Sequence, residues 1–178
     1  MILTRRGQTV GLVFLLVLGL GCRKSFGQEM HGFSEAKLAA PRAMLPAVQF
    51  SGLEGGQQTL AGHGGKMAVL NFWATWCPPC VAELPALDRL AAQEPQLAVI
   101  AVSNDRGGAA VVKPFLKAHG ISHVQVWLDP KGEAARALNV AGLPTTLVLD
   151  AKGQLCATLE GPSEWDKQAE AIKKSCGE

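Results

Sequence analysis

The pattern of apolar and polar positions divides the chain into an apolar run near the N-terminus, a mixed polar segment and a regular body. Residues 10–20 form the apolar run, and residues 23–45 are mixed and polar, with several glycines and prolines. From about residue 46, short apolar stretches alternate with amphipathic ones, as in a globular domain of strands and helices. We therefore predict three parts: a signal, lipoprotein or membrane-anchor segment at 1–22, a linker at 23–45, and one domain at 46–178.

Several apolar runs in the body have the length of strands, and the nearly continuous ones are typical of strands buried on both faces. We predict buried strands at 67–73, 97–103 and 124–128. Glycine-bounded runs predict two short strands at 47–50 and 57–60 and a hairpin at 145–150 and 154–160. Amphipathic patterns predict helices from the region of Cys80 to Gln93, at 109–119, at 133–138, and after Ser163.

The predicted order is strand, helix, strand, helix, strand, followed by a hairpin and a helix. Helical crossovers between strands demand parallel neighbours, whereas a hairpin adds antiparallel strands. The sequence therefore predicts an α/β fold with a central mixed sheet, helices on both faces and an N-terminal strand extension.

Composition and charge exclude some classes of protein. The chain is 48% apolar with a mean hydropathy of +0.15, which is too apolar for a disordered protein. Its net charge is +2, but Arg5, Arg6, Arg23 and Lys24 all precede Glu29, the first acidic residue. The remainder carries 13 basic residues against 15 acidic ones. A slightly acidic body disfavours nucleic-acid binding.

The N-terminus has the layout of an export signal. Arg5 and Arg6 precede an apolar run of about a dozen residues, which is short for a membrane-spanning helix. The small residues just before Cys22 resemble a lipoprotein cleavage site at which Cys22 would be lipidated, although Gly19 departs from the usual leucine. An uncleaved anchor and a plain cleaved signal remain alternatives. In each case we expect the domain in the periplasm or another extracytoplasmic space, where disulfides persist.

A CxxC motif carries the clearest chemistry. Cys77 follows a buried strand and precedes a helix, so its sulfur would face unpaired N–H groups that favour the reactive thiolate. Pro78 suits the first helical position and stiffens the loop. Cys80, one turn further, can reach the Cys77 sulfur and act as the resolving thiol. We expect a redox pair, with a structural bridge or half of a zinc site as alternatives.

Zinc has little support, because the four histidines form no second metal-like pair on one element. We expect no metal, and no cofactor other than the redox-active Cys77–Cys80 disulfide.

Together with the CxxC, the segments Asn71–Cys80, Ser103–Asp105, Leu128–Pro130 and Gly142–Thr146 resemble thioredoxin. The similarity is closer to the extracytoplasmic, membrane-anchored thioredoxins of the TlpA/ResA kind, and it covers residues 46–170.

The resemblance implies roles for residues around the cysteines. It implies a cis bond between Leu143 and Pro144 that faces the disulfide, with backbone near Thr145 exposed for pairing with an extended substrate. Trp76 is expected to shield the disulfide and contact partners.

Glu83 is a further candidate. It shares a helix face with Cys80, and the resemblance implies an acidic residue near the active cysteines. A carboxylate there can relay protons and raise thiol pKa values by like-charge repulsion. Ordinary thioredoxins have a buried aspartate six residues before the first cysteine, and here that position is Asn71, which cannot titrate. A solvated surface role for Glu83 is the alternative.

Cys156 and Cys176 are candidates for a structural disulfide. About 17 Å of strand leads away from Cys156 and about 20 Å of helix leads back to Cys176, so the two ends can meet. Such a bond would hold the C-terminal helix.

We conclude that the sequence predicts a monomeric extracytoplasmic thiol–disulfide oxidoreductase, tethered to the membrane by its N-terminus. By resemblance, it would take electrons from a membrane thiol donor and reduce disulfides on client proteins of the cytochrome c or copper-site assembly type. A general dithiol oxidant, a metal carrier or chaperone, and a peroxidase are the alternatives.

Overall fold

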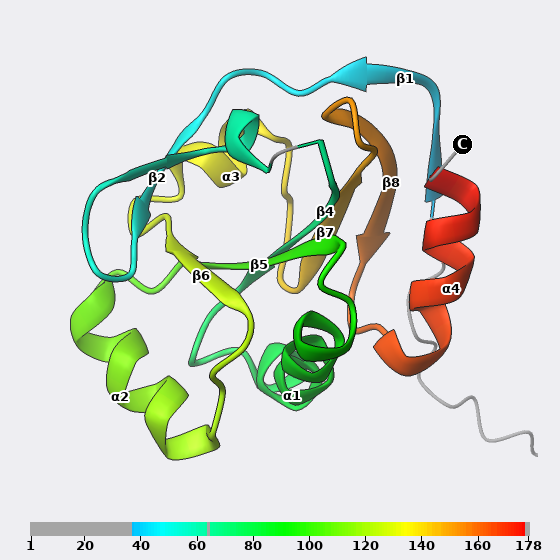
Figure 1. Ribbon diagram of the computed structural model, residues 1–178. Helices are drawn as coiled ribbons and strands as arrows, with labels where there is room; N and C mark the ends of the chain where they lie inside the picture. Colours follow the sequence, from blue (N-terminus) through cyan, green and yellow to red (C-terminus); the bar gives the residue numbers. More distant parts are fainter. Residues whose placement is uncertain (1–36, 64, 177–178) are drawn as a thin grey trace, which may run out of the picture. The chain divides into compact units, whose positions relative to one another are not determined.

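The computed structural model describes residues 37–63 and 65–176 (Figure 1). The predicted signal segment 1–22 with Cys22, and the first part of the predicted linker, lie outside the described residues. Within the described ranges, no helix is both long and apolar enough to cross a membrane.

The strands of the described residues form one eight-stranded mixed sheet in the order β1-β8-β7-β4-β5-β6-β2-β3. Their bounds are β1 Lys37–Met44, β2 Gln49–Gly52, β3 Gln57–Thr59, β4 Met67–Trp73, β5 Leu97–Ser103, β6 Gln125–Leu128, β7 Thr145–Leu149 and β8 Gln154–Glu160. The pairs β4–β5 and β5–β6 are parallel and the other pairs are antiparallel. The predicted mixed sheet is therefore confirmed.

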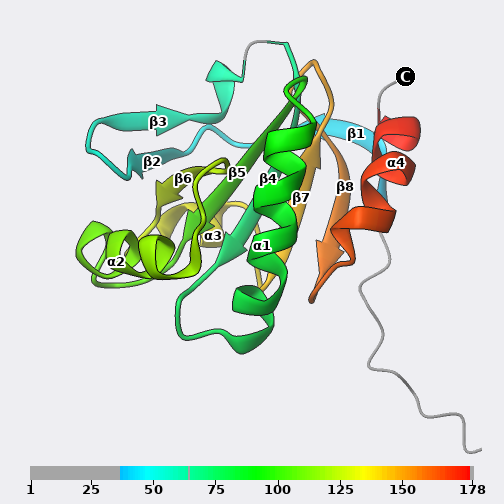
Figure 2. The ribbon, with the colours of Figure 1, turned by 60° about the horizontal axis from the view of Figure 1, so that its bottom comes forward.

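Helices cover both faces of this sheet, as predicted. They are α1 Pro78–Gln93, α2 Ala109–His119, α3 Glu133–Ala137 and α4 Trp165–Cys176, with a short 3₁₀ helix at Leu60–Gly62. Buried side chains of α1, α2 and α4, such as Leu84, Leu116 and Ile172, join one apolar cluster. Ala134 of α3 and Phe50 of β2 belong to the cluster on the other face. Figure 2 shows α1 in front of the sheet and α3 behind it.

The strand β1 differs from the sequence prediction, which places residues 37–44 in a linker. It forms one edge of the sheet and pairs antiparallel with β8, with a register shift between Leu38 and Ala43. Pro41 lies between these two residues, and proline is tolerated in a sheet at an edge or a bulge, where no ladder N–H is needed. The proline and the lack of an alternating pattern explain why the sequence predicts no strand here.

Strand direction determines where the candidate chemistry gathers. The parallel strands β4 and β5 end at the same edge of the sheet, because Trp73 is registered with Ser103. The antiparallel β7 begins at this edge, since its Thr145 is registered with Phe72 of β4. The loop after β4, the loop after β5 and the segment that enters β7 therefore meet at one end of the sheet.

Candidate active site

The CxxC occupies the junction of β4 and α1. Cys77 has an extended backbone, with φ −99° and ψ 101°, and α1 begins at the next residue, Pro78. The Cys77 amide donates to the carbonyl of Ala74 at 3.1 Å, which closes a tight turn before the helix. A disulfide joins Cys77 to Cys80, whose Cα atoms are 5.3 Å apart. The first sulfur is thus held at a helix N-terminus, where positive polarisation stabilises a thiolate.

The two cysteines differ in access to solvent. Cys80 is fully buried, whereas Cys77 is 5% exposed. Trp76 is 67% exposed, and Pro78 and Pro79 are exposed as well. Exposed apolar side chains therefore flank Cys77, the less buried of the two cysteines, and this arrangement suits Cys77 as the attacking thiol and Cys80 as the resolving one.

The segment before β7 has the backbone that the resemblance implies. The Leu143–Pro144 peptide bond is cis, which confirms that expectation. Pro144 is buried and Leu143 is half-buried, while the Thr145 hydroxyl donates to the carbonyl of Gly142 at 2.8 Å. The carbonyl of Pro144 accepts a 2.8 Å hydrogen bond from Gly161, at the end of β8. A role of this segment in pairing with substrate stays a prediction.

Glu83 is buried, contrary to the alternative of a solvated surface residue. It is 6% exposed, and its Oε1 accepts from Asn71 Nδ2 while its Oε2 accepts from the Ser163 amide, each at 2.8 Å. Burial raises the pKa of Glu83 above its ordinary value of 4.5, and the hydrogen bonds from Ser163 and Asn71 offset only part of this effect. A carboxyl with a raised pKa keeps its proton to a higher pH than an exposed glutamate does, which suits it to exchange a proton with a thiol.

Asn71 and Thr146 are part of this network, and the sequence analysis assigns no role to either. The Asn71 amide donates to Thr146 Oγ1 at 2.9 Å as well as to Glu83. Thr146 follows Thr145 in β7, so one buried amide connects the carboxyl on α1 to the strand that follows the cis-proline. The only indication in the sequence is that Asn71 replaces a titratable residue.

Asp105 positions the loop that carries the cysteines, and the sequence analysis mentions it only as part of a similar segment. Its carboxylate accepts from the Thr75 amide at 2.9 Å and from the Thr75 hydroxyl at 2.6 Å. The Ser103 hydroxyl also donates to it, at 2.9 Å. Asp105 is 3% exposed, so these charge-assisted bonds fix the loop between β4 and Cys77 firmly.

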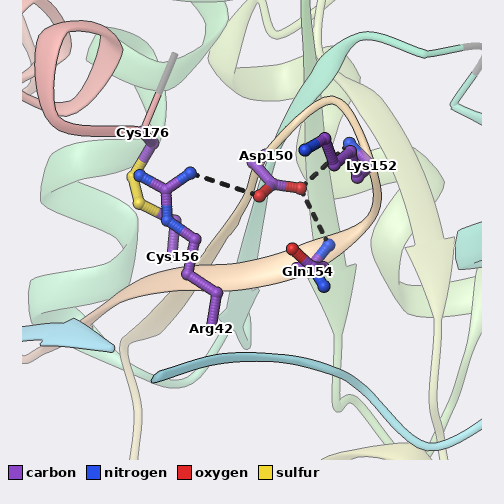
Figure 3. A network of polar contacts seen from close by, with 6 residues as sticks. All are labelled: Arg42, Asp150, Lys152, Gln154, Cys156 and Cys176. Atoms are coloured by element: carbon purple, nitrogen blue, oxygen red, sulfur yellow. Dashed lines mark hydrogen bonds and ion pairs between the residues drawn. A yellow bond between two sulfur atoms is a disulfide. The ribbon is translucent and has the colours of Figure 1, made fainter. Parts of the chain in front are cut away.

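Cys156 and Cys176 lie away from this site, between β8 and the end of α4. A disulfide joins them, with 5.6 Å between the Cα atoms, and both residues are almost fully buried. Figure 3 shows this disulfide together with the ion pair between Arg42 and Asp150, whose charged atoms are 3.3 Å apart.

Within residues 37–63 and 65–176, no group of three or more His, Cys, Asp or Glu side chains is arranged to hold a metal ion.

A disulfide of CxxC type at a helix N-terminus, facing the edge of the sheet where a cis-proline enters β7, defines a thiol–disulfide oxidoreductase of thioredoxin-like fold. Residues 39–158 match the model of the AhpC/TSA family, and the chain belongs to this family.

Named relatives and a solved structure agree with this class. The chain is 32% identical to thiol-disulfide oxidoreductase ResA of Bacillus thuringiensis over 131 residues, which are 72% of this chain and 75% of the relative. It is 36% identical to a thiol:disulfide interchange protein DsbE homolog of Paracoccus denitrificans over 132 residues, 70% of each chain. The structure of an exposed lipoprotein thioredoxin of Streptococcus pneumoniae is similar with a TM-score of 0.64 and 28% identity, and covers 72% of this chain and 99% of that one. The protein is thus a thioredoxin-like redox enzyme.

Proposed function

We propose that the protein reduces disulfides of client proteins outside the cytoplasm, held near the membrane by its N-terminus. The observation that carries this direction of electron flow is the buried carboxyl of Glu83, one helical turn after Cys80. A dithiol pair becomes a strong oxidant when its reduced, thiolate form is stabilised. A carboxylate beside the buried thiol has the opposite effect, because like charges raise the pKa of the Cys80 thiol.

The geometry supports a two-step exchange. The Cys77 thiolate attacks a client disulfide, which forms a mixed disulfide and releases one client thiolate that takes up a proton. Glu83 then accepts the proton of Cys80, and the resulting thiolate attacks the Cys77 sulfur. The second client sulfur leaves as a thiolate and takes up the proton that Glu83 holds, so two electrons pass to the client and the Cys77–Cys80 disulfide forms.

Client contact is assigned to the surface around Cys77. Trp76, Pro78 and the Leu143–Thr145 segment are the groups we expect to meet an extended client chain. From the resemblance to the TlpA/ResA kind of thioredoxin, clients with paired cysteines in cytochrome c or copper-site assembly are proposed, with a membrane thiol donor that restores the dithiol.

Localisation and anchoring are part of the proposal. The solved neighbour from Streptococcus pneumoniae is named as an exposed lipoprotein, and this supports lipidation at Cys22 of the present chain. Mass spectrometry of the membrane fraction tests it: a lipid mass on Cys22 is expected, and its loss in Cys22→Ser should release the protein. We expect a monomer, which size-exclusion chromatography with light scattering checks.

The function is tested by insulin reduction with Cys77→Ser and Cys80→Ser variants. Both variants should lose turnover, and only Cys80→Ser should form a stable mixed disulfide through Cys77. Unchanged activity in both variants would contradict the hypothesis that the protein is an enzyme. The direction is tested by the reduction potential. A reduction potential of about −120 mV, as for strong oxidants, would show that the protein is a general dithiol oxidant and not a reductase.

A further inference from the structure

The segment that leads into α4 touches two parts of the active site. The Ser163 amide donates to the Glu83 carboxylate at 2.8 Å, and the Gly161 amide donates to the Pro144 carbonyl at 2.8 Å. The first residue of α4, Trp165, is 1% exposed, and a groove of about 430 Å³ between α1 and α4 is lined by both Trp165 and Glu83. The position of α4 therefore determines how well Glu83 is shielded from water.

The other end of α4 is held by the second disulfide. Cys176 is the last residue of the helix, and its sulfur is bonded to Cys156 in β8. Figure 3 shows this bond from close by. It closes a loop of 20 residues that contains Gly161, Ser163 and Trp165. A covalent link thus encloses the whole segment that contacts Glu83 and Pro144.

The other polar links of α4 are weak by comparison. The Arg89–Asp166 ion pair, at 3.1 Å, joins side chains that are 53% and 68% exposed. The Lys173–Glu94 pair, at 2.8 Å, joins side chains that are 29% and 32% exposed. Solvent-exposed ion pairs of this kind contribute little to stability. The apolar contacts of the helix include the buried side chains of Trp165 and Ile172.

We propose that the Cys156–Cys176 disulfide is a positioning element of the active site, which holds α4 in place so that Ser163 and Trp165 cover the Glu83 carboxyl. The inference rests on the proposed function of Glu83 as the group that takes the proton of Cys80. Without the covalent link, α4 opens more readily and water reaches Glu83 through the groove between α1 and α4.

The charged groups around Glu83 do not reverse this expectation. Glu164, Asp166 and Lys167, at the start of α4, line the groove beside Glu83, and Arg89 of α1 is paired with Asp166. Lys167 is paired with Glu164 and Arg89 with Asp166, so their charges largely cancel.

The other elements around Glu83 contribute mainly neutral groups. β4 and β7 contribute the neutral side chains of Asn71 and Thr146, and β8 ends in the exposed Glu160. Burial raises the pKa of Glu83 and outweighs the hydrogen bonds from Ser163, Asn71 and Trp165, which lower it. Opening α4 exposes the carboxyl and removes both kinds of effect, so the net change is a lower pKa, toward 4.5.

The test is a Cys156→Ala/Cys176→Ala variant of the full chain with the Cys77–Cys80 disulfide intact. The Glu83 carboxyl is titrated by ¹³C NMR, with its signal assigned from Glu83→Gln. We expect a lower Glu83 pKa than in the parent and hydrogen exchange of the Ser163 amide that is faster by about tenfold or more. A Glu83 pKa that is unchanged or higher overturns the proposal. If this variant does not fold, Cys156→Val/Cys176→Ala, which restores part of the lost volume, is titrated in the same way.

Lys173→Ala is the matched control, because it removes the ion pairs with Glu94 and Glu170 from the last turn of α4 and keeps the disulfide. The Glu83 titration should be unchanged in this variant. The pH profile of client reduction should shift in the disulfide-free variant, but show no further shift when Glu83→Gln is also present. If removing the disulfide shifts the pH profile equally in the Glu83→Gln background, the disulfide has only a structural role.

The NMR readout separates this inference from the proposed function. The NMR titration does not depend on enzyme activity. If Glu83→Gln leaves client reduction unaltered, the proton-transfer role of Glu83 fails, but the titration still shows whether the disulfide controls the burial of its carboxyl.

Discussion

Asn71 donates a hydrogen bond of 2.8 Å from its side-chain amide to the carboxyl of Glu83, in a part of the protein where Asn71 is 1% exposed. The same amide nitrogen donates to Thr146 at 2.9 Å. Ordinary thioredoxins have a titratable aspartate at this position, whereas here Asn71 is a neutral hydrogen-bond donor. The buried carboxyl beside it belongs to Glu83 of α1. The groups that donate to the Glu83 carboxyl are neutral, so it can ionise without a like charge in direct contact.

Replacing this donor by a second carboxyl should be costly at neutral pH. In Asn71→Asp, a carboxylate oxygen takes the place of the amide nitrogen that donates to Glu83 Oε1, so two oxygens face each other and Glu83 loses this donor. The free energy of unfolding should therefore fall by about 1–3 kcal/mol at pH 7. The loss should shrink at pH 5, because the two carboxyls can share a proton. Urea unfolding at both pH values measures this. Thr146→Val, which removes a hydrogen bond without adding charge, should show a loss that does not depend on pH.

The ionisation of Glu83 should itself make stability depend on pH. Its pKa is raised in the folded state, so the contribution to stability is complete below about 4.5 and is lost as the pH rises through the folded-state pKa. Glu83→Gln cannot ionise and lacks this loss. The difference in unfolding free energy between variant and parent should therefore move in favour of the variant from pH 4 to pH 8. A difference that is constant over this range contradicts the raised pKa.

The sequence predicts the elements whose pattern is local. The runs 67–73 and 97–103 are apolar throughout because both faces of these strands are covered, and β4 and β5 have the predicted ends. The helix at 109–119 also ends where Gly120 stops it, in a left-handed conformation with φ 65° that glycine adopts without strain.

Contacts between distant segments could not be predicted in the same way. Ser163 donates from its backbone to Glu83, and any non-proline residue has that N–H, so the residue type carries no information about the contact. Thr146 and Asp105 likewise meet their partners only after strands that are far apart in the chain have paired. The CxxC was recognisable because its chemistry depends on the spacing of two cysteines within one helical turn.

Asp88 supports the fold in the second half of α1, further along the helix than the cysteines. Its Oδ1 accepts backbone hydrogen bonds from Ser122, His123 and Val124 at 3.0, 2.7 and 2.9 Å, which fixes the loop between α2 and β6. Asp88→Ala leaves these donors without an acceptor and should lower the free energy of unfolding by about 2–3 kcal/mol. Thermal and urea unfolding measure the loss. Asp88→Asn keeps an oxygen acceptor and should lose less than half as much; equal losses would show that the three hydrogen bonds are not responsible.

Asp150 should confer stability that is lost in acid. Burial alone would raise the pKa of Asp150, but hydrogen bonds from the Gln154 and Lys152 amides and from Arg42 lower it below its ordinary value of 3.8 (Figure 3). The carboxyl is 4% exposed, yet a surface hairpin and one arginine cover it rather than the core, so solvent screens the charges and each contribution is small.

A lowered folded-state pKa gives stability that is present above 3.8 and is lost as the pH falls through the folded-state value. Asp150→Ala should therefore cost about 1 kcal/mol at pH 7 and less as the pH falls below about 4. Urea unfolding from pH 7 to pH 3 measures the difference, and a gap that widens in acid would contradict the assignment.

Trp76 should contribute to the binding of protein clients but not to the rate of thiol–disulfide exchange itself. An indole that is 67% exposed next to the reactive sulfur offers a large apolar surface, and aromatic residues of this kind dominate the energy of many interfaces. Trp76→Ala should reduce kcat/KM for a protein disulfide by about tenfold, which corresponds to about 1.4 kcal/mol of lost binding. Reduction of a small disulfide by the reduced enzyme should change less than twofold, because such a substrate is too short to contact the indole.

The comparison of the two substrates decides between contact and distortion. If Trp76→Ala slowed the small and the large disulfide equally, the indole would act by holding the Cys77 loop and not by touching the client. Met44, which is 66% exposed and lies at the end of β1, offers a control of similar exposure on another element. Met44→Ala should leave both rates unchanged, so a loss confined to Trp76 and to protein substrates identifies the surface beside Cys77 as the one that clients contact.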